Sequence, residues 1–206
     1  MNFLAHLYLS GDDDRLIIGN FIADMVKGQK INGYPSEIIK GIKLHREIDA
    51  FTDNHHIFRQ SKERLREKYR LYAGVIVDMY YDHFLAKNWP SYSKHPLNEY
   101  ADKAYKLLQQ HFDLLPPKAR YILPFMVENN WLVNYADPEQ MKRYFGGMSR
   151  RTPFASGMEH AVDDLLVHYS DFGREFADFF PELKSYVENH GVSHRHHENQ
   201  STSQHL

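Results

Sequence analysis

The sequence predicts a single all-α domain, a helical bundle of about eight helices. Apolar residues recur at helical spacing in most segments, and we find no segment with the apolar–polar alternation of a strand. No Gly-, Ser- or Pro-rich linker divides the 206 residues, a length that suits one sizeable core. We expect residues 1–188 to form this domain and the polar, His-rich residues 189–206 to be a disordered tail.

Helix boundaries are marked by residues that cap or break helices. Gly11 is expected to end the first helix, Asp12–Asp14 to cap the second, and Ser36 or Pro35 to open the third. Pro124 is expected to interrupt a later helix. The expected helices cover residues 2–10, 14–26, a segment from about 36 that carries His45 and Asp49, 57–69, 71–88, 97–113, a segment after Pro117, 138–146 and 153–180, with a final turn after Pro181.

Composition and missing motifs exclude several classes of protein. The net charge of −2 gives no bulk attraction to nucleic acid or to an anionic membrane. No apolar run approaches the ~18 residues of a membrane span, and cysteine is absent, which suits the cytoplasm. The chain has no P-loop, GxGxxG, GxSxG or HExxH motif, and no Glu-x-x-His pair of a di-iron carboxylate bundle.

Two predicted helices carry ionisable residues along an apolar stripe. In the first, His45, Asp49 and Asp53 stand four residues apart and continue the stripe of Ile38 and Ile42. In the second, Asp78 and Asp82 fall on one face with Leu71, Val75 and Leu85. An ionised carboxylate in a core must be paired or bound to a metal, so a metal ion, a Lys or Arg side chain, or a proton has to compensate.

A shared metal ion would explain these residues together. Asn20 and Asp24 repeat the four-residue spacing, His6 lies in the first apolar helix, and His83 adjoins Asp82. Carboxylates with one or two imidazoles suit Mn²⁺, Mg²⁺ or Fe²⁺ better than a structural zinc. Such a metal activates water near neutral pH, and phosphate ester hydrolysis is the natural use.

Each of these residues also has a structural explanation. His45 and Asp49 could form a surface ion pair, and Asp78 and Asp82 could face solvent or pair with Arg46 and Lys43. His6 could be a core histidine, and Asp24 a helix cap. Asp53 lies at the end of its helix, where capping or a rim contact is the stronger expectation.

Four motifs resemble the acyl carrier protein phosphodiesterase family. They are MNFLAHLYLS, GNFIADMVKG, GIKLHREIDAFTDNH and VDMYYDHFLAKNW, followed more loosely by NNWLVNYAD and GMSRR. The resemblance implies an all-helical relative of the HD metallophosphohydrolases that removes 4′-phosphopantetheine from holo acyl carrier protein with a divalent metal, typically Mn²⁺. It also implies a place in fatty acid and lipid metabolism. An HD site contains an adjacent His-Asp pair, which this chain lacks, so we expect a distorted HD-like site.

The hypothesis of a metal-dependent phosphodiesterase assigns a role to each candidate residue. The expected metal ligands are Asp24, His45, Asp49, Asp78 and Asp82. Arg46 and Lys27 would neutralise the phosphate, and His6 or His83 would protonate the serine alkoxide or orient the water. The basic rim expected to receive the acidic carrier protein comprises Lys27, Lys40, Lys43, Arg46, Arg150 and Arg151. The alternatives are an HD-like phosphohydrolase acting on a nucleotide or another small phosphoester, and a non-catalytic helical binding module.

Overall fold

The computed structural model describes residues 1–191, and these residues form an all-α fold without a strand. The α-helices are α1 (Phe3–Leu9), α2 (Asp14–Ile22), α3 (Ser36–Asn54), α4 (His56–Tyr69), α5 (Ala73–Lys87), α6 (Leu97–Gln110), α7 (Pro117–Glu128), α8 (Trp131–Asn134), α9 (Pro138–Ser149), α10 (Ala161–Val167) and α11 (Tyr169–Gly191). The all-α prediction is confirmed, whereas the HD-like detail stays a prediction. The tail expected at 189–206 lies almost wholly outside the described residues.

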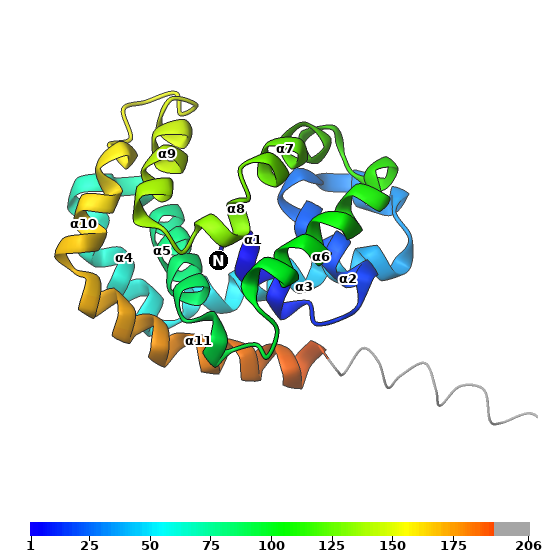
Figure 1. Ribbon diagram of the computed structural model, residues 1–206, viewed down its shortest axis with the longest axis horizontal. Coiled ribbons are helices and arrows are strands. Elements are labelled where there is room, and N and C mark those ends of the chain that lie inside the picture. Colours follow the sequence, from blue (N-terminus) through cyan, green and yellow to red (C-terminus); the bar gives the residue numbers. More distant parts are fainter. Residues whose placement is uncertain (192–206) are drawn as a thin grey trace, which may run out of the picture.

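Helix α5 is the centre of the bundle. Eleven of its fifteen residues are buried, because it is apolar on nearly every face. It packs against α1, α4 and α11. In Figure 1, α4, α9 and α10 lie on one side of α5 and α1, α2 and α6 on the other, while α11 runs along the base of both groups. Helix α5 therefore contacts α1 on one side, the helix that carries His6.

Helices α2 and α3 meet through two glycines. A Cβ atom on Gly19 would lie 2.1 Å from the Ile38 carbonyl oxygen, and one on Gly41 would lie 2.4 Å from the Leu16 carbonyl oxygen. Only glycine permits backbones to approach so closely. This contact places Asn20 of α2 directly against His45 of α3.

The expected single helix over 153–180 is wrong. Gly157 adopts a left-handed φ of 69°, and regular structure resumes only at the 3₁₀ turn η6 (Met158–His160). His168, at φ −110° and ψ 26°, then separates α10 from α11. The amphipathic pattern continued across these breaks because both flanking helices bury one face.

Three helix breaks expected at proline or glycine residues are wrong. Helix α7 continues through Pro124, α11 continues through Pro181, and α9 extends to Ser149 beyond Gly146 and Gly147. Each proline removes one intrahelical hydrogen bond, but the surrounding turns and packing maintain the helix. Within residues 1–191, no helix combines the length and apolar composition needed to cross a bilayer.

Candidate metal centre

Four side chains converge where α1, η1 (Ala23–Met25) and α3 meet. We call His6, Asp24, His45 and Asp49 the histidine–carboxylate cluster. His45 Nε2 lies 3.2 Å from both Asp24 Oδ1 and Asp49 Oδ2, and His6 Nε2 lies 3.2 Å from Asp49 Oδ1. The structure thus brings together three of the predicted ligands and adds His6, which the sequence had suggested as a proton donor.

Asn20 fixes the orientation and tautomer of His45. His45 Nδ1 lies 2.9 Å from the Asn20 side-chain oxygen and 3.0 Å from its backbone oxygen. The Asn20 amide nitrogen is committed elsewhere, since it donates to the His6 carbonyl and the Ser10 hydroxyl. Both groups facing Nδ1 are therefore acceptors, so Nδ1 carries the proton of the neutral ring. The Nε2 lone pair then points at the two carboxylates, as a metal-ligating histidine requires.

The contacts inside the cluster are close enough to be ion pairs when an imidazole is protonated, but their geometry is not that of hydrogen bonds. Among the described residues, both ring nitrogens of His6 and Nε2 of His45 are buried without a hydrogen-bond partner, although carboxylate oxygens lie 3.2 Å away. Donor atoms that share one cation approach one another in this way, because each points at the ion rather than at its neighbour. One ligand atom each from His6, His45 and Asp49 lies within 4.8 Å of the others. The donor set therefore fits a divalent cation held by nitrogen and oxygen.

Exposure is graded across the cluster. The side chains of His6 and His45 are 4% and 8% exposed, whereas those of Asp49 and Asp24 are 40% and 78% exposed. The imidazoles form a buried base and the carboxylates a face open to solvent. Solvent therefore reaches the cluster from the carboxylate side.

Burial and charge separate the two imidazoles. Burial lowers the pKa of His6 to about 4, so this ring is neutral at pH 7. Burial also acts to lower the pKa of His45, but Asp24 and Asp49 outweigh it and raise that pKa to about 9. Burial opposes ionisation of Asp49, yet the two histidines hold the pKa of this carboxyl well below its usual range. Without metal, His45 is the cation of the cluster.

Asp78 and Asp82 of α5 contact the start of α1, and none of their recorded partners belongs to the cluster. Asp78 Oδ1 accepts a hydrogen bond from the Met1 ammonium at 2.7 Å, and Asp82 accepts from the backbone N–H groups of residues 2, 4 and 5. Neither the solvent channel nor the Arg46 and Lys43 partners considered from the sequence account for these two carboxylates. Their assignment as metal ligands stays a prediction.

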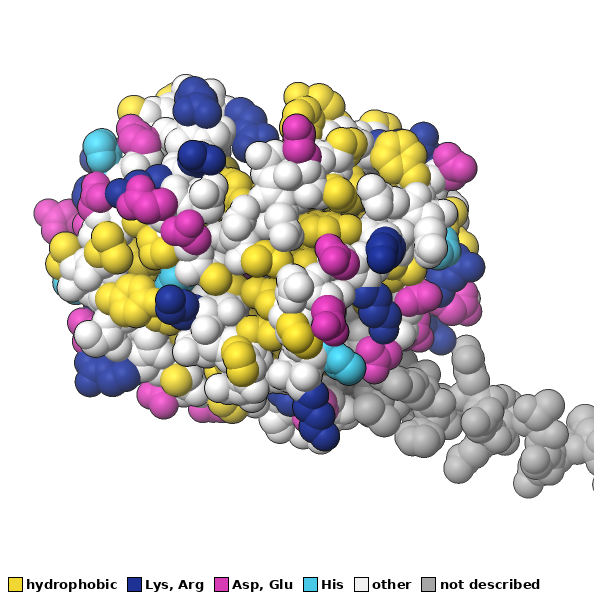
Figure 2. Space-filling view, in the orientation of Figure 1, with side chains coloured by type: hydrophobic (Ala, Val, Ile, Leu, Met, Phe, Trp, Pro, Cys, Tyr) yellow, Lys and Arg dark blue, Asp and Glu magenta, His cyan; other side chains and the backbone are white. Residues whose placement is uncertain are grey.

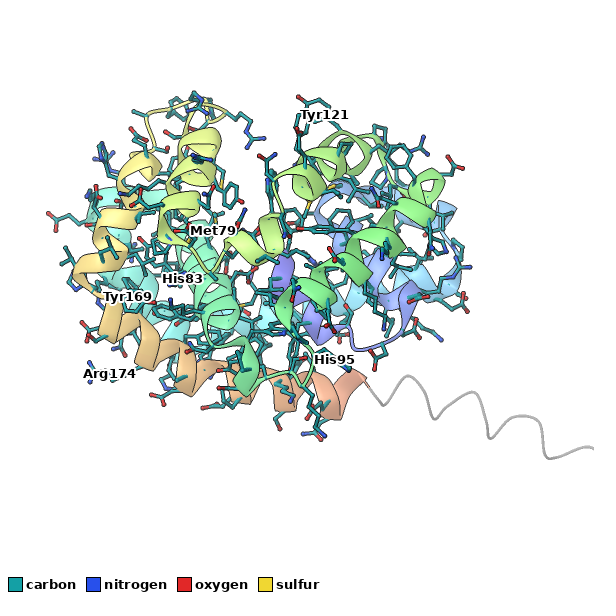
Figure 3. The ribbon with its side chains drawn as sticks, in the orientation of Figure 1. Met79, His83, His95, Tyr121, Tyr169 and Arg174 are labelled. Atoms are coloured by element: carbon teal, nitrogen blue, oxygen red, sulfur yellow. The ribbon has the colours of Figure 1, made fainter. Side chains whose placement is uncertain are left out.

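His83 is engaged outside the cluster. Its Nδ1 lies 2.8 Å from the Tyr135 carbonyl oxygen, and its Nε2 lies 2.9 Å from the Tyr169 hydroxyl, so Nδ1–H donates and Nε2 accepts. Figure 3 shows His83 beside Tyr169, between α5 and the start of α11. The structure thus separates His6, which joins the cluster, from His83, whose two nitrogens have other partners.

The predicted phosphate-binding residues are close to cluster residues in the sequence. Arg46 and Lys27 are exposed, the first adjacent to His45 and the second three residues after Asp24. Lys40 and Lys43 instead line a cavity of about 940 Å³ together with Leu44. This cavity lies on a different face of α3 from His45 and Asp49. Of the expected basic rim, Lys40, Lys43 and Arg46 are therefore divided between faces of α3, and Arg150 and Arg151 follow α9.

Two functional features were missed in the sequence. The role of Asn20 had a signal, its four-residue spacing from Asp24, but the sequence alone did not show that it faces His45. The Met1 ammonium had none, because its partner Asp78 lies 77 residues away.

Comparison with known proteins shows the family of this chain. The family model described as "Acyl carrier protein phosphodiesterase" matches residues 1–183. A relative of that name from Photorhabdus laumondii is 34% identical over 193 residues, which cover 92% of this chain and 96% of the relative. Relatives of the same name from Klebsiella pneumoniae and Shigella boydii are each 33% identical to this chain, and the matched residues cover 98% and 95% of these relatives. No solved structure matches the chain. The chain belongs to the acyl carrier protein phosphodiesterase family.

Proposed function

We propose that this chain is a metal-dependent phosphodiesterase that removes 4′-phosphopantetheine from the serine of holo acyl carrier protein and gives the apo carrier. The observation that carries this proposal is the histidine–carboxylate cluster, whose His6, His45 and Asp49 donor atoms converge within 4.8 Å of one another. The names of the relatives supply the substrate. The proposed place of action is the cytoplasm, which suits a chain without cysteine.

His6, His45, Asp49 and Asp24 would hold the cation, for which Mn²⁺ is the first choice and Mg²⁺ or Fe²⁺ the alternatives. When bound, it supplies a hydroxide-like water and polarises the phosphoryl group. The neutral His6 ring offers a lone pair and is a poor proton donor at pH 7, because its pKa is about 4. We therefore assign His6 to the ligand set in place of the proton-donor role.

The chain's other residues would orient the reacting groups. The oxygen of water attacks phosphorus, the bond from phosphorus to the serine oxygen breaks, and the serine oxygen takes up, through solvent, the proton that the attacking water loses. Arg46 and Lys27, which are exposed and close in the sequence to His45 and Asp24, would bind the non-bridging oxygens and offset the negative charge of the phosphodiester.

Docking of the acidic carrier protein would use the same two cations. On the face shown in Figure 2, Lys and Arg side chains are interspersed with Asp and Glu side chains. That face offers no continuous basic surface for an acidic partner. We place the carrier over Arg46 and Lys27, because both are exposed and close in the sequence to cluster residues.

The test is conversion of holo to apo carrier protein, followed by mass spectrometry with the metal-stripped chain and added Mn²⁺. We expect hydrolysis with Mn²⁺, none with chelator, and loss of activity in Asp49→Asn and His45→Gln. Asp53→Asn is the matched control, since Asp53 lies one turn further along α3 and is exposed. No apo product at saturating Mn²⁺, or cleavage of nucleotides and small phosphoesters instead, would overturn the proposal.

A further inference from the structure

Asp82 caps a helix from a different part of the chain. Its side chain is fully buried, and its two oxygens accept hydrogen bonds from the backbone N–H groups of Leu4 at 2.7 Å, Asn2 at 3.2 Å and Ala5 at 3.4 Å. The first N–H groups of a helix have no partner within it, and leaving them buried and unbonded is costly. Asp82 satisfies them from α5.

Asp78 performs the related task one turn earlier on α5. It accepts from the buried Met1 ammonium at 2.7 Å, while Asp49 lies 3.9 Å from the same nitrogen. A buried ammonium is tolerated when a carboxylate compensates its charge. We call Asp78 and Asp82 together the α1 socket.

The orientation of α1 matters because α1 carries His6. The helix has seven residues, too few to be stable alone, so its position depends on the contacts at its ends. The socket holds the first turn, and Asn20 holds the last, through the His6 carbonyl and the Ser10 hydroxyl. A small rotation of α1 would move the His6 ring away from Asp49, 3.2 Å from its Nε2.

We infer that Asp78 and Asp82 are positioning residues: they seat the first turn of α1 and thereby set the His6 imidazole against His45 and Asp49. This inference rests on the proposed function, which makes the cluster a metal site. It assigns Asp78 and Asp82 a positioning role in place of metal ligation. The geometry carries it, since both oxygens of Asp82 and Oδ1 of Asp78 already have donors from residues 1–5.

The first experiment uses the metal-free full chain with labelled histidine. Asp82→Asn keeps the size of the side chain but replaces one acceptor by an NH₂ group that faces backbone N–H groups. We expect the amides of Leu4 and Ala5 to exchange at least about tenfold faster and the His6 ring resonances to shift, while the amides of α4 keep their protection. Unchanged His6 resonances in a folded Asp82→Asn protein would overturn the inference.

The second experiment asks whether Asp78 acts through α1. It combines Asp78→Asn with a Gly-Ser extension before Met1, which removes the ammonium and leaves every side chain intact. If Asp78 seats the N-terminal ammonium, each change alone shifts the His6 resonances and weakens Mn²⁺ binding about 10- to 100-fold, the range seen for residues that orient a ligand. The two together cost no more than either alone.

Additive losses, or an extension without effect, would make Asp78 an independent ligand and overturn the inference. A Gly-Ser extension at the C-terminus is the control. The His6 resonances require neither metal nor carrier protein, so failure of the parent chain to hydrolyse holo carrier protein would remove the proposed function and leave these results standing.

Discussion

The imidazole rings of His6 and His45 stack with their centroids 3.9 Å apart and their planes 15° from parallel. They come from α1 and α3, and they share Asp49 as a neighbour. Two protonated rings could not coexist at this distance in a buried site. Their stacking therefore requires one neutral ring, which is His6.

The first prediction concerns the titration of these rings in metal-free protein. NMR should show His6 titrating at about 4 and His45 at about 9. Because its pKa is raised, His45 stabilises the fold in full below pH 6.5, and this stabilisation is lost as the pH rises to 9. The lowered pKa of His6 costs stability as the pH falls from 6.5 to 4. Together these two groups give the metal-free chain its highest stability near pH 6.5, to be checked by thermal melting against pH. Coincident titration of the two rings would contradict this.

The second prediction concerns Asn20. Asn20→Ala removes the side-chain acceptor of His45 and the donor to the His6 carbonyl, so both rings lose an anchor. We expect Mn²⁺ affinity to fall about 10- to 100-fold, measured by calorimetry. Asn54→Ala is the control, because Asn54 is exposed at the end of α3, the helix of His45, and its side chain donates only to the Ala50 carbonyl in the recorded contacts. Equal affinities of the two variants would exclude an orienting role for Asn20.

The third prediction concerns the approach of α2 to α3. In Gly41→Ala the added methyl would lie 2.4 Å from the Leu16 carbonyl oxygen, which is backbone and cannot move alone. We expect a loss of about 1–3 kcal/mol in the free energy of unfolding, measured with urea, and weaker metal binding because His45 moves relative to Asn20. Gly33→Ala, with open space around its Cβ position, should change neither quantity.

The fourth prediction separates stability from the site. Glu175 of α11 is buried, and its two oxygens accept from Arg64 of α4 at 2.6 and 2.7 Å. Glu175→Leu leaves the guanidinium without its carboxylate, so unfolding should become easier by about 2 kcal/mol or more. Mn²⁺ affinity of the folded variant should equal that of the parent, since neither residue contacts the histidine–carboxylate cluster in the recorded contacts. A parallel loss of Mn²⁺ affinity would show that α11 is coupled to the site and would contradict this prediction.

The sequence predicted the all-α fold well because apolar periodicity reports burial directly. Helix α3 shows this, since the stripe through Ile38, Ile42 and His45 is buried as expected. The break at His168 was not predictable, because it depends on how α10 and α11 pack and not on a breaking residue.

For the site, the sequence showed that Asp78 and Asp82 need a compensating group but not which one. Metal ions, ammonium groups and backbone N–H groups all satisfy a carboxylate. The groups found here come from residues 1–5, and only the fold brings them to α5. His6 was ambiguous for the same reason, since its neighbours lie on α3.

The graded exposure of the cluster has a consequence for how substrate is delivered. A phosphodiester on serine is tethered to a folded carrier by a single methylene group, so it cannot enter a deep pocket without the carrier's backbone following. In the proposed site, Asp24, 78% exposed, brings the carboxylate face almost to the protein's outer boundary, with the imidazoles behind it. The shallow placement lets two rigid bodies touch edge to edge while the bond to be cut remains within reach.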